Sequence, residues 1–221
     1  MSEPTTRSTS AHPETVEPAR WVLNAGSGPR SAFGLHPVFR DPAWHEVTLD
    51  IDARTKPDLV GSVSDMSAIA DATFDAIWCS HNLEHLYGHE IGRALAEFKR
   101  VLKPDGFSLI TCPDLEEVAK LVASGKGEDV AYQSPAGPIT ALDMLYGHSA
   151  SIARGYEFMA HRTGFTADRL GRLLVESGFD EVFVIKGKGF DLWALALMPG
   201  AKKTELQQEL YTLGLDFIAD G

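Results

Sequence analysis

The segment Trp21–Arg30, with the sequence WVLNAGSGPR, decides the fold. Its apolar start, Trp21–Leu23, predicts a short buried strand, which is followed by two glycines one residue apart, Gly26 and Gly28. Glycine adopts positive φ angles and lets a ligand approach the backbone, because it has no Cβ. In open α/β sheets, a strand that ends in such a turn forms a nucleotide crevice at the carboxyl edge. The segment therefore predicts a ligand-binding turn, with an ordinary strand-to-helix turn as the alternative.

The composition is typical of a single globular domain. The chain has 221 residues, of which 44% are hydrophobic and 23% charged. It carries 20 Lys and Arg against 31 Asp and Glu, a formal net charge of −11, and no basic cluster offsets this charge. A polyanion would be repelled, so we expect no nucleic-acid partner. No apolar run reaches the ~18 residues of a membrane span, so we expect no membrane partner either.

The two cysteines and the N-terminus bear on the location of the protein. Cys79 and Cys112 lie in apolar, strand-like segments, which predicts buried free thiols in a reducing compartment. The N-terminus has no apolar segment of the kind found in signal peptides. We therefore expect a cytoplasmic protein. Residues 1–19 are rich in Ser, Thr, Pro and Glu, and we predict a mobile tail there.

Strands and helices alternate along the chain, which predicts an α/β fold with a mostly parallel sheet. The expected strands are 21–23, 46–50, 58–63, 74–79, 107–111, 181–186 and 192–198. The expected helices are 91–102, 114–124, 164–178 and 202–218, with shorter turns at 31–39 and 66–72. We expect one domain over 20–200, an insertion at 125–163, and a peripheral C-terminal helix within 201–221. That helix would pack on its own domain or on a second copy of the chain in a homodimer.

Five motifs occur in a fixed order: VLNAGSGP, VTLDID, SVSDM, FDAIWCSHNLEHL and RVLKPDGFSLIT. In this order and spacing the chain resembles the class I S-adenosylmethionine-dependent methyltransferases, most of all small bacterial members with Leu-Glu-His after the fourth strand. The resemblance covers about residues 21–113 and resumes at 164–197. It implies a Rossmann-like, mostly parallel seven-stranded sheet with helices on both faces and an antiparallel last strand. It also implies S-adenosyl-L-methionine as cofactor and methyl transfer to an O, N or S atom of a small-molecule acceptor.

The resemblance assigns cofactor-binding residues. Gly26 and Gly28 would approach the cofactor, and Asp50, which ends the second strand, would accept hydrogen bonds from the ribose hydroxyls. A solvated loop acid or a helix cap is the alternative for Asp50. The remaining expected cofactor residues are Asn24, Asp65 and Met66 near the adenine or methionine parts, and Ser80 and His81 near the methyl group. Asp65 could equally cap the turn that follows it.

Asn24 is a departure from the resembled family, in which many members carry an acidic residue at this position. An amide forms hydrogen bonds but does not offset the positive charge of the methionine moiety. This departure keeps open a second hypothesis, a cofactor-binding module without transferase activity.

The segment His81–His85, HNLEH, is followed by His89. On a helix, His81, Glu84, His85 and His89 would share one face and could hold a divalent metal. The string also matches H-x-x-E-H, the inverted zinc-peptidase pattern, which suggests a metal-dependent hydrolase as an alternative function. That pattern requires an uninterrupted helix, whereas this segment follows an apolar strand and leads into a Tyr-Gly turn. We therefore expect a structural or pocket-lining cluster without metal, with a metal site for acceptor binding as the alternative.

The insertion at 125–163 is rich in Gly, Pro, aromatic residues and His. Long irregular segments in compact domains are often functional, and in the resembled family insertions here cover the cofactor and form the acceptor pocket. The expected acceptor-binding residues are Tyr132, Tyr146, His148, Tyr156 and Arg162. His81 or His161 would act as general base or orient the acceptor, because imidazole titrates near neutrality.

Overall fold

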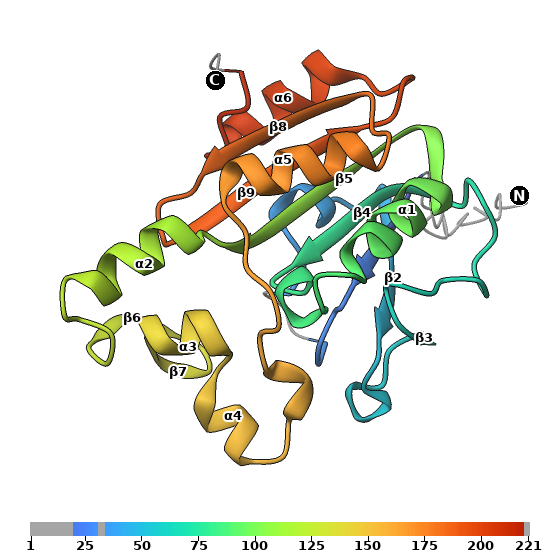
Figure 1. Cartoon of the computed structure of the whole chain (residues 1–221). Helices are drawn as coiled ribbons and strands as arrows, with labels where there is room; N and C mark the ends of the chain where they lie inside the picture. Colours follow the sequence, from blue (N-terminus) through green and yellow to red (C-terminus); the bar gives the residue numbers. More distant parts are fainter. Residues whose placement is uncertain (1–19, 31–33, 219–221) are drawn as a thin grey trace, which may run out of the picture.

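The computed structural model describes residues 20–30 and 34–218, and the predicted tail 1–19 lies outside the described residues. A seven-stranded sheet forms the centre of the molecule, in the order β3-β2-β1-β4-β5-β9-β8 (Figure 1). Its strands are β1 (Arg20–Ala25), β2 (Trp44–Asp50), β3 (Leu59–Val60), β4 (Phe74–Ser80), β5 (Leu102–Pro113), β8 (Glu181–Lys186) and β9 (Asp191–Leu197). β1 to β5 pair in parallel, and β9 runs antiparallel to both of its neighbours. The expected Rossmann-like sheet with an antiparallel last strand is confirmed.

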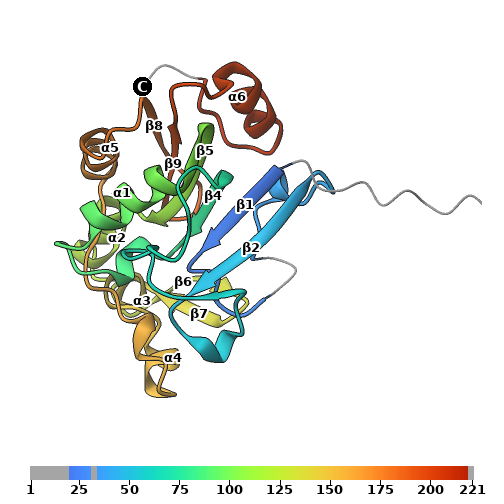
Figure 2. The same cartoon turned by 90° about the vertical axis from the view of Figure 1, so that its right-hand side faces the viewer.

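Helices cover both faces of the sheet (Figure 2). The helices are α1 (Ile91–Val101), α2 (Leu115–Ala123), α3 (Ala141–Tyr146), α4 (Ser149–Ala153), α5 (Ala167–Glu176) and α6 (Lys203–Thr212). Successive strand residues point to opposite faces, so Leu23 joins the apolar cluster under α1 and α5 while Val22 joins the cluster under α6. No helix in the described part of the chain is long and apolar enough to cross a membrane.

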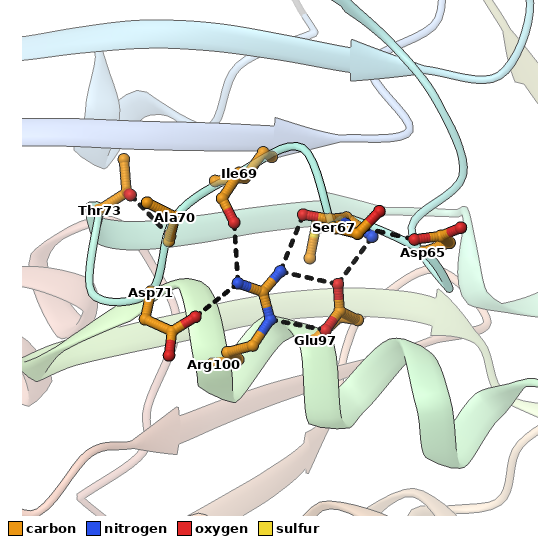
Figure 3. Close-up of polar contacts among 9 residues, drawn as sticks. Asp65, Ser67, Ile69, Ala70, Asp71, Thr73, Glu97 and Arg100 are labelled. Carbon is orange, nitrogen blue, oxygen red and sulfur yellow. Dashed lines mark hydrogen bonds and ion pairs between the residues drawn. The ribbon is translucent and has the colours of Figure 1, made fainter.

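The described residues that connect β1, β2 and β3 form no α-helix. Turns and the 3₁₀ helices Pro37–Phe39 and Ala53–Thr55 link these strands, and the expected third strand, 58–63, is only Leu59–Val60. The expected helical turn at 66–72 is also irregular, because side chains of α1 satisfy its backbone groups. Arg100 donates to the Ile69 carbonyl and to Asp71, and it is held by Glu97 (Figure 3).

The C-terminal helix is shorter than expected. α6 ends at Thr212, and Gly214 then adopts a φ of 91°, which reverses the chain. The returning segment places Phe217 in the core under α6, where its carbonyl accepts a hydrogen bond from Gln207. Leu213, which follows the last residue of α6, is exposed. Contact of this helix with a second copy of the chain stays a prediction.

The inserted segment folds into small elements beyond the carboxyl end of β4 (Figure 1). A hairpin of β6 (Val130–Ser134) and β7 (Gly137–Thr140) leads into α3 and α4. Thr140 and Asp143 form a reciprocal capping box that starts α3. An apolar cluster that includes Val118 and Met144 fastens α3 to α2. The insertion is therefore an ordered part of the fold that faces the carboxyl edge of the sheet.

Candidate functional site

A cavity of about 340 Å³ lies at the carboxyl ends of β1, β2 and β4, and we call it the strand-end cavity. Gly26, Gly28 and Asp50 line one side of it, and His81 and Asn82 line another. The carboxyl edge of a parallel sheet is where open α/β folds bind ligands, because the connections on either side diverge there. The cavity therefore lies where the glycine turn predicted a crevice.

The two glycines of the turn serve different purposes. Gly26 has a φ of 75°, and a Cβ on it would lie 2.0 Å from the Asn82 amide nitrogen. Gly28 has a φ of 59°, and a Cβ there would meet no atom within 4 Å. Gly26 is thus required by packing within the protein, whereas Gly28 leaves open space beside the cavity that a ligand can use.

Asp50 secures the glycine turn. One carboxylate oxygen accepts a hydrogen bond of 2.8 Å from the Gly28 N–H, and the other accepts one of 2.8 Å from the Asp52 N–H. Each oxygen of a carboxylate has a further acceptor position, so the side chain can hold the turn and still bind hydroxyl groups. Asp52 forms an ion pair with Arg54, and the hydrogen bonds from Arg54 lower the pKa of Asp52.

Four of the expected cofactor residues do not line the strand-end cavity: Asn24, Asp65, Met66 and Ser80. Met66 is buried in the core, and its N–H is bound by Glu97 of α1, so the connection after β3 is drawn away from the cavity. Asp65 is exposed, and its carboxylate accepts a hydrogen bond from the Ser67 N–H. This is the contact expected if Asp65 caps the turn that follows it. Ser62 and Val63 line the cavity at this end instead.

Asn24 is buried, and its amide donates a hydrogen bond of 2.7 Å to the Glu46 carboxylate on β2. A carboxylate, that of Glu46 on the neighbouring strand β2, therefore lies beside the position where many members of the resembled family have an acidic residue. Because Asn24 lies outside the cavity lining, its departure from an acidic residue does not alter the walls of the cavity. The basis for the hypothesis of a binding module without activity is weakened accordingly.

A second, smaller cavity of about 130 Å³ lies between the insertion and the segment after β4, and we call it the insertion cavity. Tyr132, His148 and His161 of the insertion line it. It shares His81, His85 and Met159 with the strand-end cavity. The two cavities are therefore adjacent.

The expected acceptor residues are divided among the cavities. Tyr156 and Arg162 line the strand-end cavity, next to Phe158, which was not singled out in the sequence. Tyr146 is 68% exposed and lines neither of these cavities; it lines a third cavity, of about 230 Å³, which Glu84 also lines. The aromatic composition of the insertion is the sequence feature that could have indicated Phe158 as a cavity residue. No sequence feature indicates that Asn82 packs against Gly26.

A model of a family described as "Methyltransferase domain" matches residues 41–110. Solved structures with a similar fold include a methyltransferase from Thermotoga maritima titled as a possible histamine N-methyltransferase, with 15% identity, coverage of 83% of this chain and 84% of that chain, and a TM-score of 0.53. An S-adenosylmethionine-dependent methyltransferase from Archaeoglobus fulgidus has 14% identity, coverage of 81% and 86%, and a TM-score of 0.52. No curated protein sequence matches the chain.

Residues 41–110 thus match a methyltransferase domain, and the described chain has the fold of the S-adenosylmethionine-dependent methyltransferases. It is an enzyme of methyl transfer, and its cofactor is S-adenosylmethionine. The strand-end cavity fits this cofactor: the Asp50 carboxylate can accept from ribose hydroxyls, Gly28 allows close approach, and Ile51 and Leu86 provide apolar wall.

The HNLEH segment of the methyltransferase is not an α-helix. Leu83–His85 forms a 3₁₀ helix, so His81, Glu84, His85 and His89 do not share a helical face. His89 is exposed and stacks on Tyr87, with ring centroids 5.8 Å apart. The uninterrupted helix of an inverted zinc-peptidase site is absent from this described segment, and the metal-dependent hydrolase hypothesis loses its structural context.

Glu84 is the most deeply buried titratable group of this segment, with 1% of its surface exposed. The Nδ1 atom of His81 lies 3.3 Å from its Oε1 atom. Burial on its own would raise the pKa of the Glu84 carboxyl, but the facing imidazoles, His81 first, hold it below its ordinary value. Desolvation would lower the pKa of His81, but Glu84 more than offsets this, and the pKa of His81 is raised.

His161 faces the same carboxylate from the insertion. Its ring lies 4.8 Å from that of His85, centroid to centroid, in an edge-to-face arrangement. Burial lowers the pKa of His161 and thus favours the neutral form of the ring. The expected pocket-lining cluster therefore includes His161 of the insertion, whereas His89, which the alternative metal site would have used, is not part of it.

Proposed function

We propose that this methyltransferase transfers a methyl group to an O, N or S atom of a small molecule bound in the insertion cavity. The observation that carries the proposal is that the insertion cavity and the strand-end cavity share His81 and His85. A group bound in one cavity is therefore next to a group bound in the other. The small volume of the insertion cavity and the net charge of −11 favour a small acceptor over a nucleic acid.

S-adenosylmethionine supplies an activated methyl group when bound, so the protein needs mainly to align the acceptor and exclude water. We assign Asp50 to the ribose and the turn of Gly26 and Gly28 to close approach of the backbone. His81 has Nδ1 toward Glu84, which leaves Nε2 to orient the acceptor or receive its proton. Tyr132 and His148 would contact the acceptor.

Two further features complete the proposal. Arg162 lines the strand-end cavity and would bind an acidic group of a ligand, which the acidic protein would otherwise repel. Cys79 and Cys112 are free and fully buried, which supports a reducing, cytoplasmic location.

Calorimetric titration of S-adenosylmethionine and of its demethylated product tests the cofactor assignments. Asp50→Ala removes both the ribose acceptor and the support of the Gly28 N–H, and we expect affinity to fall about 30-fold or more. Asp105→Asn, which removes an exposed carboxylate outside both cavities, is the control and should bind as the parent does. Unchanged binding by Asp50→Ala would overturn its role, and absence of binding by the parent would overturn the proposed function.

A further inference from the structure

We propose that Glu84, His85 and His161 form a binding site for a divalent transition metal, with Zn²⁺ as the ion that their chemistry fits best. One ligand atom from each of these residues lies within 4.8 Å of the others. Around a zinc ion, ligand atoms about 2.1 Å from the metal lie about 3.4 Å apart, so small side-chain rotations complete the site. Two of the ligands come from the segment after β4, and the third comes from the insertion.

The hydrogen bonds of the two histidines prepare them to bind a metal. Nδ1 of His85 lies 3.2 Å from the Ala160 carbonyl, and Nδ1 of His161 lies 2.9 Å from the Met144 carbonyl. A carbonyl oxygen only accepts, so each Nδ1 carries the hydrogen and each Nε2 carries a lone pair. Metal-binding histidines are oriented in this way, with the second ring nitrogen donating to a carbonyl or carboxylate.

Glu84 supplies the independent observation. Its side chain is only 1% exposed, and neither carboxylate oxygen has a well-aligned hydrogen-bond partner in the described residues. The Nδ1 atom of His81 lies 3.3 Å from Oε1 but does not form an aligned hydrogen bond with it. The backbone around it is firmly held, because its carbonyl accepts from the N–H groups of Arg162 and Thr163. A buried carboxylate without such partners is costly, and a bound cation compensates its charge.

The ligand set selects the class of metal. Two imidazoles and one carboxylate form a three-ligand set that leaves a fourth position open, as in catalytic zinc sites. Mg²⁺ and Ca²⁺ prefer sets made of oxygen atoms and should bind weakly. All three ligands line the insertion cavity, so the open position faces the space proposed for the acceptor. Coordination of an acceptor oxygen or nitrogen there rests on the proposed function, whereas metal binding itself does not.

The test is calorimetric titration of zinc chloride into the chelator-treated, full-length protein, with cobalt(II) absorption spectroscopy as a readout of the ligand geometry. We expect one ion per chain, and at least about 100-fold weaker binding by His161→Gln. His89→Ala is the matched control, since His89 is a histidine of the same segment that lies outside the cluster, and it should bind as the parent does. Thermal unfolding with and without zinc should show stabilisation of the parent but not of His161→Gln.

The outcomes separate this inference from the proposed function. Absence of zinc binding by the parent at roughly 100 μM metal, or equal binding by His161→Gln, overturns the metal site. Loss of zinc binding in His89→Ala with retention in His161→Gln would also overturn it and would support the alternative metal site that includes His89. S-adenosylmethionine is titrated into the same samples: cofactor binding without zinc binding refutes this inference alone, and zinc binding without cofactor binding refutes the proposed function alone.

Discussion

The two halves of the sheet are built in different ways. The part of the chain that forms β4, β5, β8 and β9 also contains all six α-helices of the described residues, which begin at Ile91 or later (Figure 1). The half formed by β1, β2 and β3 is covered by turns and short 3₁₀ helices, yet it provides most of the strand-end cavity. Both halves contribute to the apolar clusters, but the connections between β1, β2 and β3 depend in addition on individual polar contacts.

Asp58 illustrates how the half without helices is held. Its carboxylate accepts hydrogen bonds from the Thr48 N–H and hydroxyl and from the Arg30 guanidinium. The backbone hydrogen bond from Thr48 is the largest cause of the lowered pKa of Asp58. Such contacts are few and specific, so we expect single substitutions to have large local effects in this half. The following predictions, from the largest effect to the smallest, test this difference.

Gly26→Ala should have the largest effect. The substitution adds the strain of a positive φ angle to a clash with the Asn82 side chain, 2.0 Å from the new Cβ. We expect a loss of about 4 kcal/mol in the free energy of unfolding and of most cofactor affinity. Urea unfolding and calorimetry measure the two losses.

Gly28→Ala is the control for steric clash, since its Cβ would meet no atom within 4 Å. It retains the strain of positive φ alone, about 1 kcal/mol. If the two variants lose equal stability, packing against Asn82 does not explain the glycine at position 26, and the contrast between the halves loses its strongest example.

His36 should make the half without helices sensitive to acid. Burial first, and then the charge of Arg40, lower the pKa of His36 from 6.5 to about 4. Below pH 6.5 the unfolded chain takes up a proton that the folded protein does not. The contribution of His36 to the free energy of unfolding is therefore complete above that pH and shrinks as the pH falls toward 4, by about 3 kcal/mol in total.

His36→Asn checks this expectation, because its side-chain oxygen can still accept from the Val38 N–H. The variant has no titrating group at this position and loses ring contacts with Trp78 and Trp193. Urea unfolding of both proteins between about pH 7 and pH 4.5 should show the stability advantage of the parent narrowing as the pH falls. A constant difference would mean that His36 is not held neutral by the fold.

Arg100→Ala should loosen the connection between the two halves. Arg100 lies on α1 and donates to the Met66 and Ile69 carbonyls, which belong to the irregular connection from β3 to β4 (Figure 3). Loss of these charged hydrogen bonds from a partly exposed side chain should cost about 2 kcal/mol in the free energy of unfolding. Thermal unfolding measures the loss.

Arg93→Ala removes the same charge from the exposed face of the same helix and is the matched control for Arg100→Ala. Its effect on stability should stay within about 0.5 kcal/mol. Equal effects of the two variants would show that the charge of α1, rather than the hydrogen bonds to the connection, matters.

Tyr156→Leu should have the smallest effect. The Arg54 guanidinium, in the connection after β2, lies over the Tyr156 ring of the insertion, 4.9 Å from its centroid. Because Tyr156 also lines the strand-end cavity, loss of this contact should weaken cofactor binding about threefold. Tyr156→Phe keeps the ring face and should bind as the parent does; a threefold loss in that variant as well would assign the effect to the hydroxyl.

The glycine turn and the strand-end acid that line the strand-end cavity were predictable from the sequence, whereas their binding to the cofactor stays a prediction. The turn at Gly26 and Gly28 and the carboxylate of Asp50 follow from local rules, since positive φ angles and strand-end acids are read from a few neighbouring residues. The positions of Asp65 and Met66 outside the strand-end cavity were not predictable in this way. Glu97 and Arg100, more than thirty residues away, bind the backbone beside them and draw it from the cavity.

The sequence by itself determined the alternation of strands and helices, the glycine turn and the acid that secures it, because these depend on short-range periodicity and backbone conformation. Only the tertiary structure decided which histidine from outside the HNLEH segment joins His81 and His85 near Glu84. On a helix, His89 would share a face with Glu84 and His85. The segment instead forms a 3₁₀ helix at Leu83–His85, and the insertion brings His161 to the Glu84 carboxylate. Side chains so distant in sequence meet because the chain buries its apolar surface around the sheet, and no local pattern specifies that packing.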